Sequence, residues 1–136
     1  MALAVDKTPR AMARLADNPV IQSMVARHEA KLGSARAWLT DILKECWAGA
    51  DDVEPLGSAD RARVRLGCSQ AVLVSLEVTD AVYKAAGTSA IFLGTPFERR
   101  FRDIHTLSQQ IQSREAHFEM VGKVMLNGDP EDTFLG

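Results

Sequence analysis

Two long stretches of the sequence repeat small or apolar residues in alternating steps of four and three positions. The members of the first stretch are Ile21, Val25, His28, Leu32, Ala35, Leu39, Ile42 and Cys46. Those of the second are Val64, Cys68, Ala71, Ser75, Val78, Val82 and Ala85. Such steps place each set on one stripe of an α-helix that packs against near-parallel neighbours. We call these stripes the first and second seam, and they predict an all-α, up-down helical bundle.

Capping signals delimit the two long helices. Asn18 followed by Pro19 predicts an N-cap and a first helical residue, and Gly49 marks the end of this helix. The second helix is predicted to have Ser58 as its N-cap and to end at Gly87. Its later half is rich in β-branched residues, but the sustained seam favours a helix buried on more than one side.

A third helix and a short fourth one follow. Thr95, Pro96 and Glu98 combine an N-cap, a proline at the first helical position and a capping-box glutamate. The predicted buried face of the third helix consists of Phe97, Phe101, Ile104, Leu107 and Ile111. Ser113 is predicted to cap the last helix, which carries Phe118, Val121 and Met125. The expected organisation is an arm or helix remnant at 1–17, a helical bundle domain at 18–126 and a flexible tail at 127–136.

Composition restricts the partners and the compartment. The chain has 136 residues, of which 46% are hydrophobic and 25% charged, and its net charge is -2. These values fit one globular domain and disfavour nucleic acid or a polybasic membrane contact. Cys46 and Cys68 form no CxxC pair, which favours a reducing compartment, so we expect a cytoplasmic protein. Charged residues interrupt every long apolar stretch, so we expect no membrane span.

The residues capable of chemistry do not form a catalytic or metal motif. His28, His105 and His117 have no partner at a spacing that would bring metal ligands together, so we predict no metal site and no catalytic residue. His28 is interpreted as a core or interface histidine, and His105 and His117 as surface or interface residues. The two cysteines are interpreted as structural because both lie on seams.

An arginine-rich segment at 98–103 leaves two interpretations open. Glu98 with Arg102 and Arg99 with Asp103 have the i,i+4 spacing of ion pairs on a solvated helix face. Three arginines within four residues, beside two phenylalanines, are also a suitable setting for a phosphate or an interdomain carboxylate.

Several segments resemble the C-terminal domain, type 2, of the acyl-CoA dehydrogenase-like flavoproteins, which include flavin-dependent monooxygenases. The segments are Lys7-Thr8-Pro9, Ala85 to Phe92, Thr95-Pro96, and Arg100 to Thr106 with Gln109. The similarity runs from about residue 3 to residue 126. It implies a helical bundle that assembles into dimers of dimers around FAD or FMN, in proteins whose N-terminal and middle domains have no counterpart in this sequence. Three of the four bundle helices are expected here, with an apolar groove left open.

The resemblance also implies where a flavin would be met. Gly87, Thr88 and Ser89 would lie near the cofactor of a neighbouring subunit, and Arg102, Thr106 and Gln110 would belong to a helix facing the flavin region. Gln110 and Ile111 stand where members of the family carry a histidine or a glutamate base. A glutamine forms hydrogen bonds but does not exchange protons near neutral pH, so general-base catalysis by this segment is not expected.

These observations predict a C-terminal helical domain of a flavin oxidoreductase that contributes to oligomer packing and to part of the flavin site. The chain alone is expected to be inactive and to bind no flavin, while FAD or FMN would be bound in the intact assembly. Its expected partners are copies of itself, as a dimer or tetramer, or companion flavoprotein domains. The alternative is a non-enzymatic helical module for oligomerisation or partner binding. An unrelated coiled-coil-like bundle does not account for the Arg100 to Thr106 segment.

Overall fold

A computed structural model describes residues 14–49 and 56–127, and these residues form helices without any strand. The elements in chain order are η1 (Leu15–Asp17), α1 (Pro19–Ala48), α2 (Ser58–Ala86), η2 (Gly87–Ile91), α3 (Pro96–Ser108), η3 (Ile111–Ser113) and α4 (Ala116–Asn127). The all-α prediction is confirmed. Most of the predicted arm at 1–17 and of the predicted tail at 127–136 lies outside the described residues.

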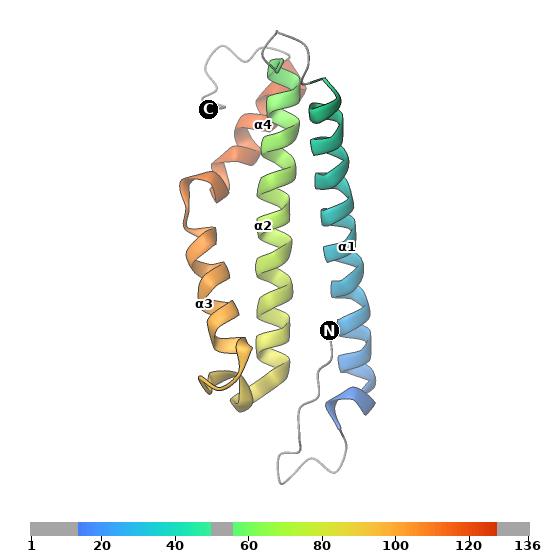
Figure 1. The fold of residues 1–136 in the computed structure, drawn as a ribbon, viewed down its shortest axis with the longest axis vertical. Coiled ribbons are helices and arrows are strands. Elements are labelled where there is room, and N and C mark those ends of the chain that lie inside the picture. Colours follow the sequence, from blue (N-terminus) through green and yellow to red (C-terminus); the bar gives the residue numbers. More distant parts are fainter. Residues whose placement is uncertain (1–13, 50–55, 128–136) are drawn as a thin grey trace.

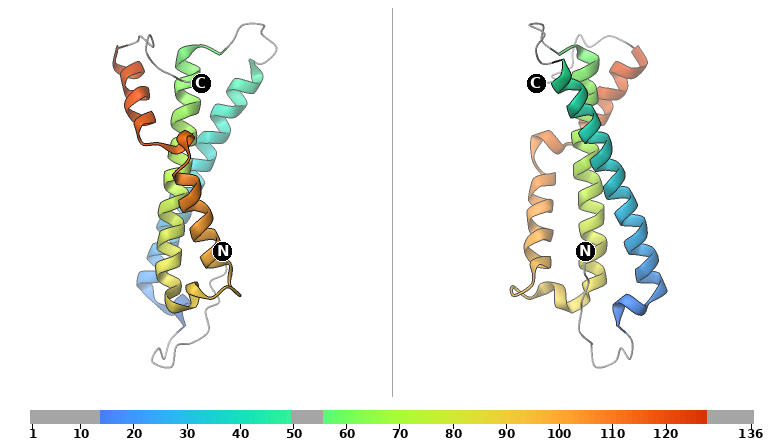
Figure 2. Two further views of the ribbon diagram at one scale, coloured as in Figure 1. Left: turned by 90° about the vertical axis from the view of Figure 1, so that its left-hand side faces the viewer. Right: turned by 45° about the vertical axis from the view of Figure 1, so that its right-hand side comes forward.

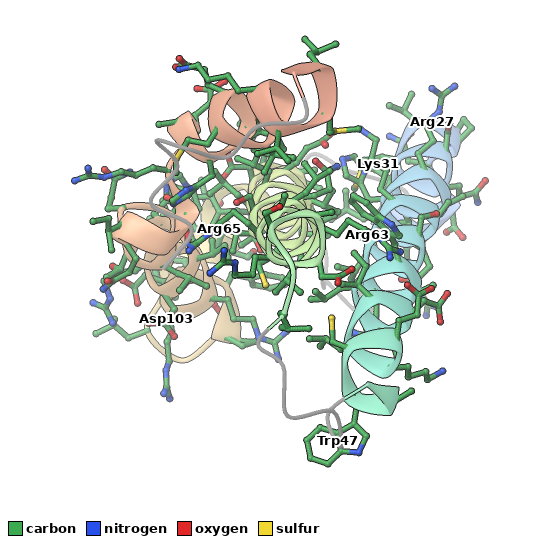
Figure 3. The ribbon with its side chains drawn as sticks, turned by 90° about the horizontal axis from the view of Figure 1, so that it is seen from above. Arg27, Lys31, Trp47, Arg63, Arg65 and Asp103 are labelled. Atoms are coloured by element: carbon green, nitrogen blue, oxygen red, sulfur yellow. The ribbon has the colours of Figure 1, made fainter. Side chains whose placement is uncertain are left out.

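Helix α2 is the centre of the fold. It packs against α1 on one side and against α3 and α4 on the other, as Figures 1 and 2 show. The view along its axis in Figure 3 places α2 between these neighbours. Helices α1 and α2 run in opposite directions, and α3 and α4 follow one another back along α2 (Figure 1). Within the described ranges, no helix combines the length and the apolar character that crossing a membrane would require.

The first seam is confirmed as the buried stripe of α1. All eight of its residues are at least half-buried, and Ala35 and Ile42 are fully buried. The predicted cap is also present, because Asn18 Oδ1 accepts a hydrogen bond of 2.9 Å from the amide of Val20. Trp47 lies off the seam and is 82% exposed, and Figure 3 shows it pointing away from the other helices.

The second seam is only partly correct, because α2 is buried on more than one side. The buried residues of α2 are Ala62, Gly67, Ser69, Val74, Val78, Val82 and Ala86. Of the predicted stripe, Val78 and Val82 are buried, whereas Cys68 is exposed, so its assignment to a buried seam was wrong. A helix with one neighbour buries one stripe, but α2 has α1 on one flank and α4 on another, so burial spreads around its axis.

Two predicted N-caps differ from the structure. The N-cap of α2 is Gly57, one residue before Ser58. Thr95 occupies the N-cap position of α3, but its side chain does not accept a hydrogen bond from the helix. Its Oγ1 instead donates to the carbonyl oxygens of Phe92 at 2.9 Å and Ser89 at 3.3 Å, which closes the loop before α3. The predicted capping box is therefore absent, and Glu98 pairs with Arg102.

The third helix ends earlier than predicted. The amide of Gln110 bonds the carbonyl of Leu107 at 3.0 Å, and this tighter turn ends the α-helical pattern at Ser108. Leu107 and Ile111, predicted on the buried face, are 46% and 58% exposed. Ser113 is a buried residue of η3 rather than a cap, and α4 begins three residues later.

Two exposed ion pairs join α1 to α2. Arg63 Nη1 lies 2.7 Å from Glu45 Oε2, and Lys31 Nζ donates to Glu77 Oε1. The hydrogen bond from Lys31 lowers the pKa of the Glu77 carboxyl, and the hydrogen bond to Glu45 raises the pKa of Arg63. Exposed pairs of this kind contribute little to stability, but they match one antiparallel register of the two helices.

Helices α1 and α2 are closely packed at Gly67. A Cβ atom at this position would lie 2.8 Å from Ile42 Cδ1 and 3.3 Å from Leu39 Cδ1. Ile42 is only 1% exposed, so its side chain has little room to move away. A residue without a side chain is therefore required for the two helices to meet at this distance.

A pair of glycine substitutions tests this contact. Gly33 lies in α1, and a Cβ atom added to it would have no neighbouring atom within 4 Å. Gly33→Ala should therefore raise the free energy of unfolding by about 0.5–1 kcal/mol, because alanine has the higher helix propensity. Gly67→Ala gains the same propensity but crowds Ile42, so we expect it to be less stable than Gly33→Ala by about 1–3 kcal/mol. Urea unfolding measures both values, and equal stabilisation by the two substitutions would contradict the close packing.

Candidate functional site

The turn predicted to lie near a cofactor follows α2 directly. Gly87 has a φ of 59° and is the only described residue with a positive φ, which accounts for glycine at this position. No atom lies within 4 Å of a Cβ built on Gly87, and Gly87 and Thr88 are exposed. Ser89 is half-buried, and its carbonyl accepts the hydroxyl of Thr95. The turn therefore presents open backbone on a surface that the following loop holds in place.

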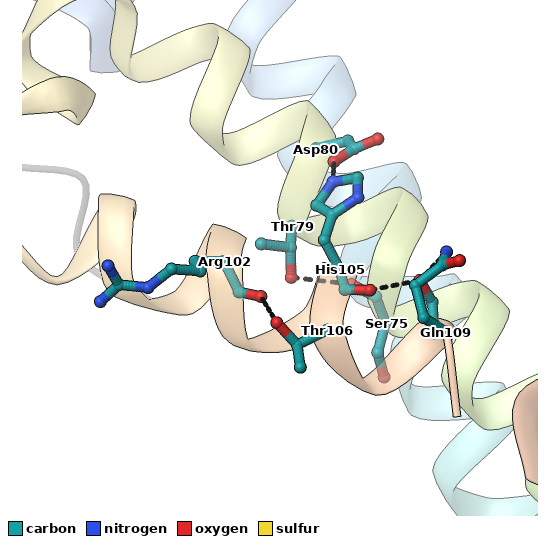
Figure 4. Close-up of polar contacts among 8 residues, drawn as sticks. Ser75, Thr79, Asp80, Arg102, His105, Thr106 and Gln109 are labelled. Atoms are coloured by element: carbon teal, nitrogen blue, oxygen red, sulfur yellow. Dashed lines mark hydrogen bonds and ion pairs between the residues drawn. The ribbon is translucent and has the colours of Figure 1, made fainter. Parts of the chain in front are cut away.

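Arg102 and Thr106 occupy one exposed face of α3, four residues apart. The Thr106 hydroxyl donates to the carbonyl oxygen of Arg102 at 2.9 Å, as Figure 4 shows. The Arg102 guanidinium pairs with Glu98 at 3.3 Å, and its side chain remains 64% exposed. The predicted i,i+4 pairing is thus confirmed for Arg102 and for Arg99 with Asp103, which are 3.5 Å apart. An exposed arginine with one carboxylate neighbour still has donors free for a phosphate.

Gln110 is not a helical residue, because α3 ends two positions before it. Gln110 is exposed, and its carbonyl accepts a hydrogen bond of 2.9 Å from the amide of Ser113. The position of Gln110 is therefore set by the connection between α3 and α4 rather than by the helix.

The six candidate residues form two groups, one in the turn before α3 (Gly87, Thr88 and Ser89) and one on the second half of α3 and just beyond it (Arg102, Thr106 and Gln110). Gly87, Thr88 and Ser89 precede the helix, whereas Gln110 follows it, and thirteen helical residues extend over about 20 Å. Arg102 and Thr106 lie between them, on the second half of the helix. The structure does not gather the six residues into one pocket of this chain.

The sequence interpretation missed a contact between α2 and α3. His105 Nε2 lies 2.9 Å from Asp80 Oδ1, and Figure 4 shows the ring directed at this carboxylate. The ring also packs on Phe101, with 4.2 Å between centroids, and Phe101 packs on Tyr83 at 4.3 Å. His105 is thus an interface residue, held by a carboxylate and an aromatic ring. No local spacing indicates this pair, because Asp80 is 25 residues away on another helix.

The remaining histidines bond backbone carbonyls. His28 Nδ1 donates to the Met24 carbonyl at 2.7 Å, and its Nε2 lies 3.9 Å from Glu77. His117 Nε2 donates to the Ile111 carbonyl at 2.7 Å. No three histidine, cysteine, aspartate or glutamate side chains gather within the described part of the chain as metal ligands would.

A groove of about 630 Å³ opens between α1 and α2, away from the candidate residues. Its lining residues are Ala30, Lys31, Ser34, Ala35, Trp38, Gln70, Val74 and Glu77. The lining combines small side chains with Trp38 and the Lys31–Glu77 ion pair. This lining is mixed, so the groove is not the apolar one that the resemblance led us to expect, and that expectation stays a prediction.

The exposed candidate residues carry groups that can bind polar ligands. Arg102 presents guanidinium donors, Gln110 an amide, and the turn at Gly87 open backbone. Such groups can form hydrogen bonds with phosphates and with polar ring atoms.

A double-mutant cycle tests the contact between Asp80 and His105. The Asp80 and His105 side chains are 32% and 40% exposed, so solvent screens their attraction. We therefore expect a coupling free energy of about 0.5–1 kcal/mol between Asp80→Ala and His105→Ala. Urea unfolding of the wild type, both single variants and the double variant gives this value. Additive effects within about 0.3 kcal/mol would show that the pair does not hold α3 to α2.

Comparison with known proteins identifies the family. Residues 2–115 match the family model described as "Acyl-CoA dehydrogenase, C-terminal domain". Similar proteins include the indole-3-acetate monooxygenases of Acinetobacter baumannii and Pseudomonas putida, which are 25% and 26% identical over 121 residues. These alignments cover 89% of this chain and 31% of each monooxygenase, so the chain spans about a third of the length of these relatives. The matched residues include α1, α2, α3 and all six candidate site residues, and the chain therefore belongs to the acyl-CoA dehydrogenase C-terminal domain family.

Proposed function

We propose that this chain is the C-terminal helical domain of an acyl-CoA dehydrogenase-like flavin oxidoreductase. In this role it contributes to subunit packing and to part of the flavin site, and it has no activity alone. The observation that carries the proposal is the separation of the candidate residues along α3, with open surface at both ends. Each group has the chemistry to contact a flavin, but each needs a second protein surface to complete a binding site.

The two groups would have different tasks in the intact assembly. The backbone at Gly87, Thr88 and Ser89 would approach the cofactor of a neighbouring subunit, and Arg102 would pair with a phosphate as a bidentate donor. Thr106 and Gln110 would supply hydrogen bonds. FAD or FMN would supply the redox chemistry when bound. Gln110 and Ile111 cannot act as general bases, so a proton acceptor would have to come from elsewhere in the assembly.

Exposed apolar side chains support self-association or a companion domain. Those on α1 are Val20, Trp38, Leu43 and Trp47, those between η2 and α3 are Phe92 and Leu93, and those at the end of α4 are Met125 and Leu126. Leu93 is 85% and Leu126 is 86% exposed, although leucine is normally buried. We take these side chains as the candidate contacts with other subunits or with a companion domain. We place this assembly in the cytoplasm, in keeping with two free cysteines.

The same exposed side chains favour a second candidate function, a non-enzymatic helical module that binds copies of itself or a partner. The two functions differ in whether flavin is present. Mass spectrometry of the protein purified under native conditions reports bound flavin and subunit number together. Flavin in the complex supports the oxidoreductase, whereas a stable homo-oligomer without flavin supports the module.

Light scattering tests self-association directly. Because the exposed apolar surface is spread over α1, the loop before α3 and α4, we expect a dimer or tetramer at micromolar concentrations. A mass of 14.9 kDa across that range would correspond to a monomer and contradict this expectation.

We call the proposed flavin-facing surface of Arg102, Thr106 and Gln110 the flavin wall. Titration calorimetry tests this proposal. The chain alone should bind FAD or FMN with a dissociation constant of hundreds of micromolar or weaker, about -5 kcal/mol or less favourable. Arg102→Ala should weaken binding further, by about 1 kcal/mol or more, because a charged hydrogen bond to phosphate is lost. Arg100→Ala is the matched control, since Arg100 is also exposed on α3. Micromolar affinity for the chain alone, or equal effects of the two substitutions, would contradict the proposed wall.

A further inference from the structure

We propose that His117 is a positioning residue for Gln110, because its ring holds the carbonyl of Ile111, the residue that follows Gln110. This inference rests on the proposed function only in giving Gln110 a place in the flavin wall. The contact itself belongs to the fold and can be tested in the chain alone.

The hydrogen bonds of this region converge on one short loop. His117 Nε2 donates to the Ile111 carbonyl at 2.7 Å, and the amide of His117 donates to the Arg114 carbonyl at 3.1 Å. The amide of Ser113 donates to the Gln110 carbonyl at 2.9 Å. The side chain of His117 therefore closes a loop whose other bonds are made by the backbone, and its anchor point is one residue from Gln110.

Packing does not explain a histidine at this position. His117 is 8% exposed, and its Nδ1 atom is buried without a hydrogen-bond partner among the described residues. A leucine would fill similar space without burying an unpaired nitrogen. Among the described residues, the one polar contact of the ring is the bond to Ile111, so we assign its role to that bond. Because Nε2 donates, the neutral ring carries its proton there and leaves Nδ1 as an acceptor.

The helix that carries His117 is fixed to α2 through the core. Val121, one turn after His117 in α4, is 2% exposed and packs with Ala62 of α2. This packing holds the helix from which the His117 ring reaches the carbonyl of Ile111.

Hydrogen exchange of the chain alone tests the positioning. In His117→Leu the amide of Ser113 should exchange about tenfold faster, the equivalent of losing one hydrogen bond. His117→Gln retains an N–H donor and should stay within about threefold of the wild type. Val121→Ala is the control for general loss of packing, and it should not accelerate Ser113 selectively relative to amides of α4. Unchanged exchange in His117→Leu, or the same selective acceleration in Val121→Ala, would overturn the proposal.

A measurement on the unmodified protein does not depend on whether the variants fold. The ¹⁵N chemical shifts of the His117 ring should show a proton on Nε2, and a ring protonated only on Nδ1 would overturn the proposal. Calorimetry with FMN then separates this inference from the proposed function. We expect His117→Leu to weaken binding as much as Gln110→Ala does, and the double variant to be no weaker. If Gln110→Ala leaves FMN binding unchanged while the exchange results hold, the flavin wall is wrong and the positioning stands.

Discussion

The fold depends on the close contact of α1 and α2 at Gly67. A Cβ at this position would lie 2.8 Å from the side chain of Ile42, so the absence of a side chain allows the two long helices to approach. Helices α3 and α4 pack on the other side of α2. Their position relative to α1 therefore depends on how α1 and α2 meet. The ion pairs of Lys31 with Glu77 and of Arg63 with Glu45 agree with the same register, but their exposure makes them secondary.

The sequence was most informative where a helix has a single neighbour. The stripe of α1 was predicted in full, because α1 packs mainly on α2 and buries one face. In α2 the same periodicity wrongly predicted that Cys68 is buried. A helix with neighbours on more than one side does not bury a single stripe of residues. Thr95 illustrates a second limit. Its position before Pro96 correctly marked the start of α3, but its hydroxyl donates to carbonyl oxygens of the preceding segment instead of accepting a hydrogen bond from a helix amide.

For the candidate site too, contacts within one helix were predicted from the sequence, whereas contacts between elements were not. The pairing of Arg102 with Glu98 follows from their spacing along one helix, whereas the position of Gln110 depends on where that helix ends. The bonds of His105 to Asp80 and of His117 to Ile111 do not follow from such spacing, because they join side chains to groups on another helix or beyond a turn. Such contacts depend on how the helices sit together, which periodicity does not specify. The resemblance to the family supplied the residues that we propose for a flavin site, whereas the structure supplied the neighbouring groups that they bond.

The length of α3 sets the distance and the rotation between the candidate residues before the helix and those at its end. Each helical residue adds about 1.5 Å of length and about 100° of rotation. Inserting one residue between Pro96 and Ser108 would turn Gln110 by more than a quarter of a circle relative to the turn at Gly87. An insertion in the exposed loop at 92–94 leaves the length and the residue spacing of α3 itself unchanged. Relatives that use both ends of this helix for one cofactor should therefore accept insertions and deletions in the loop while keeping the length of α3.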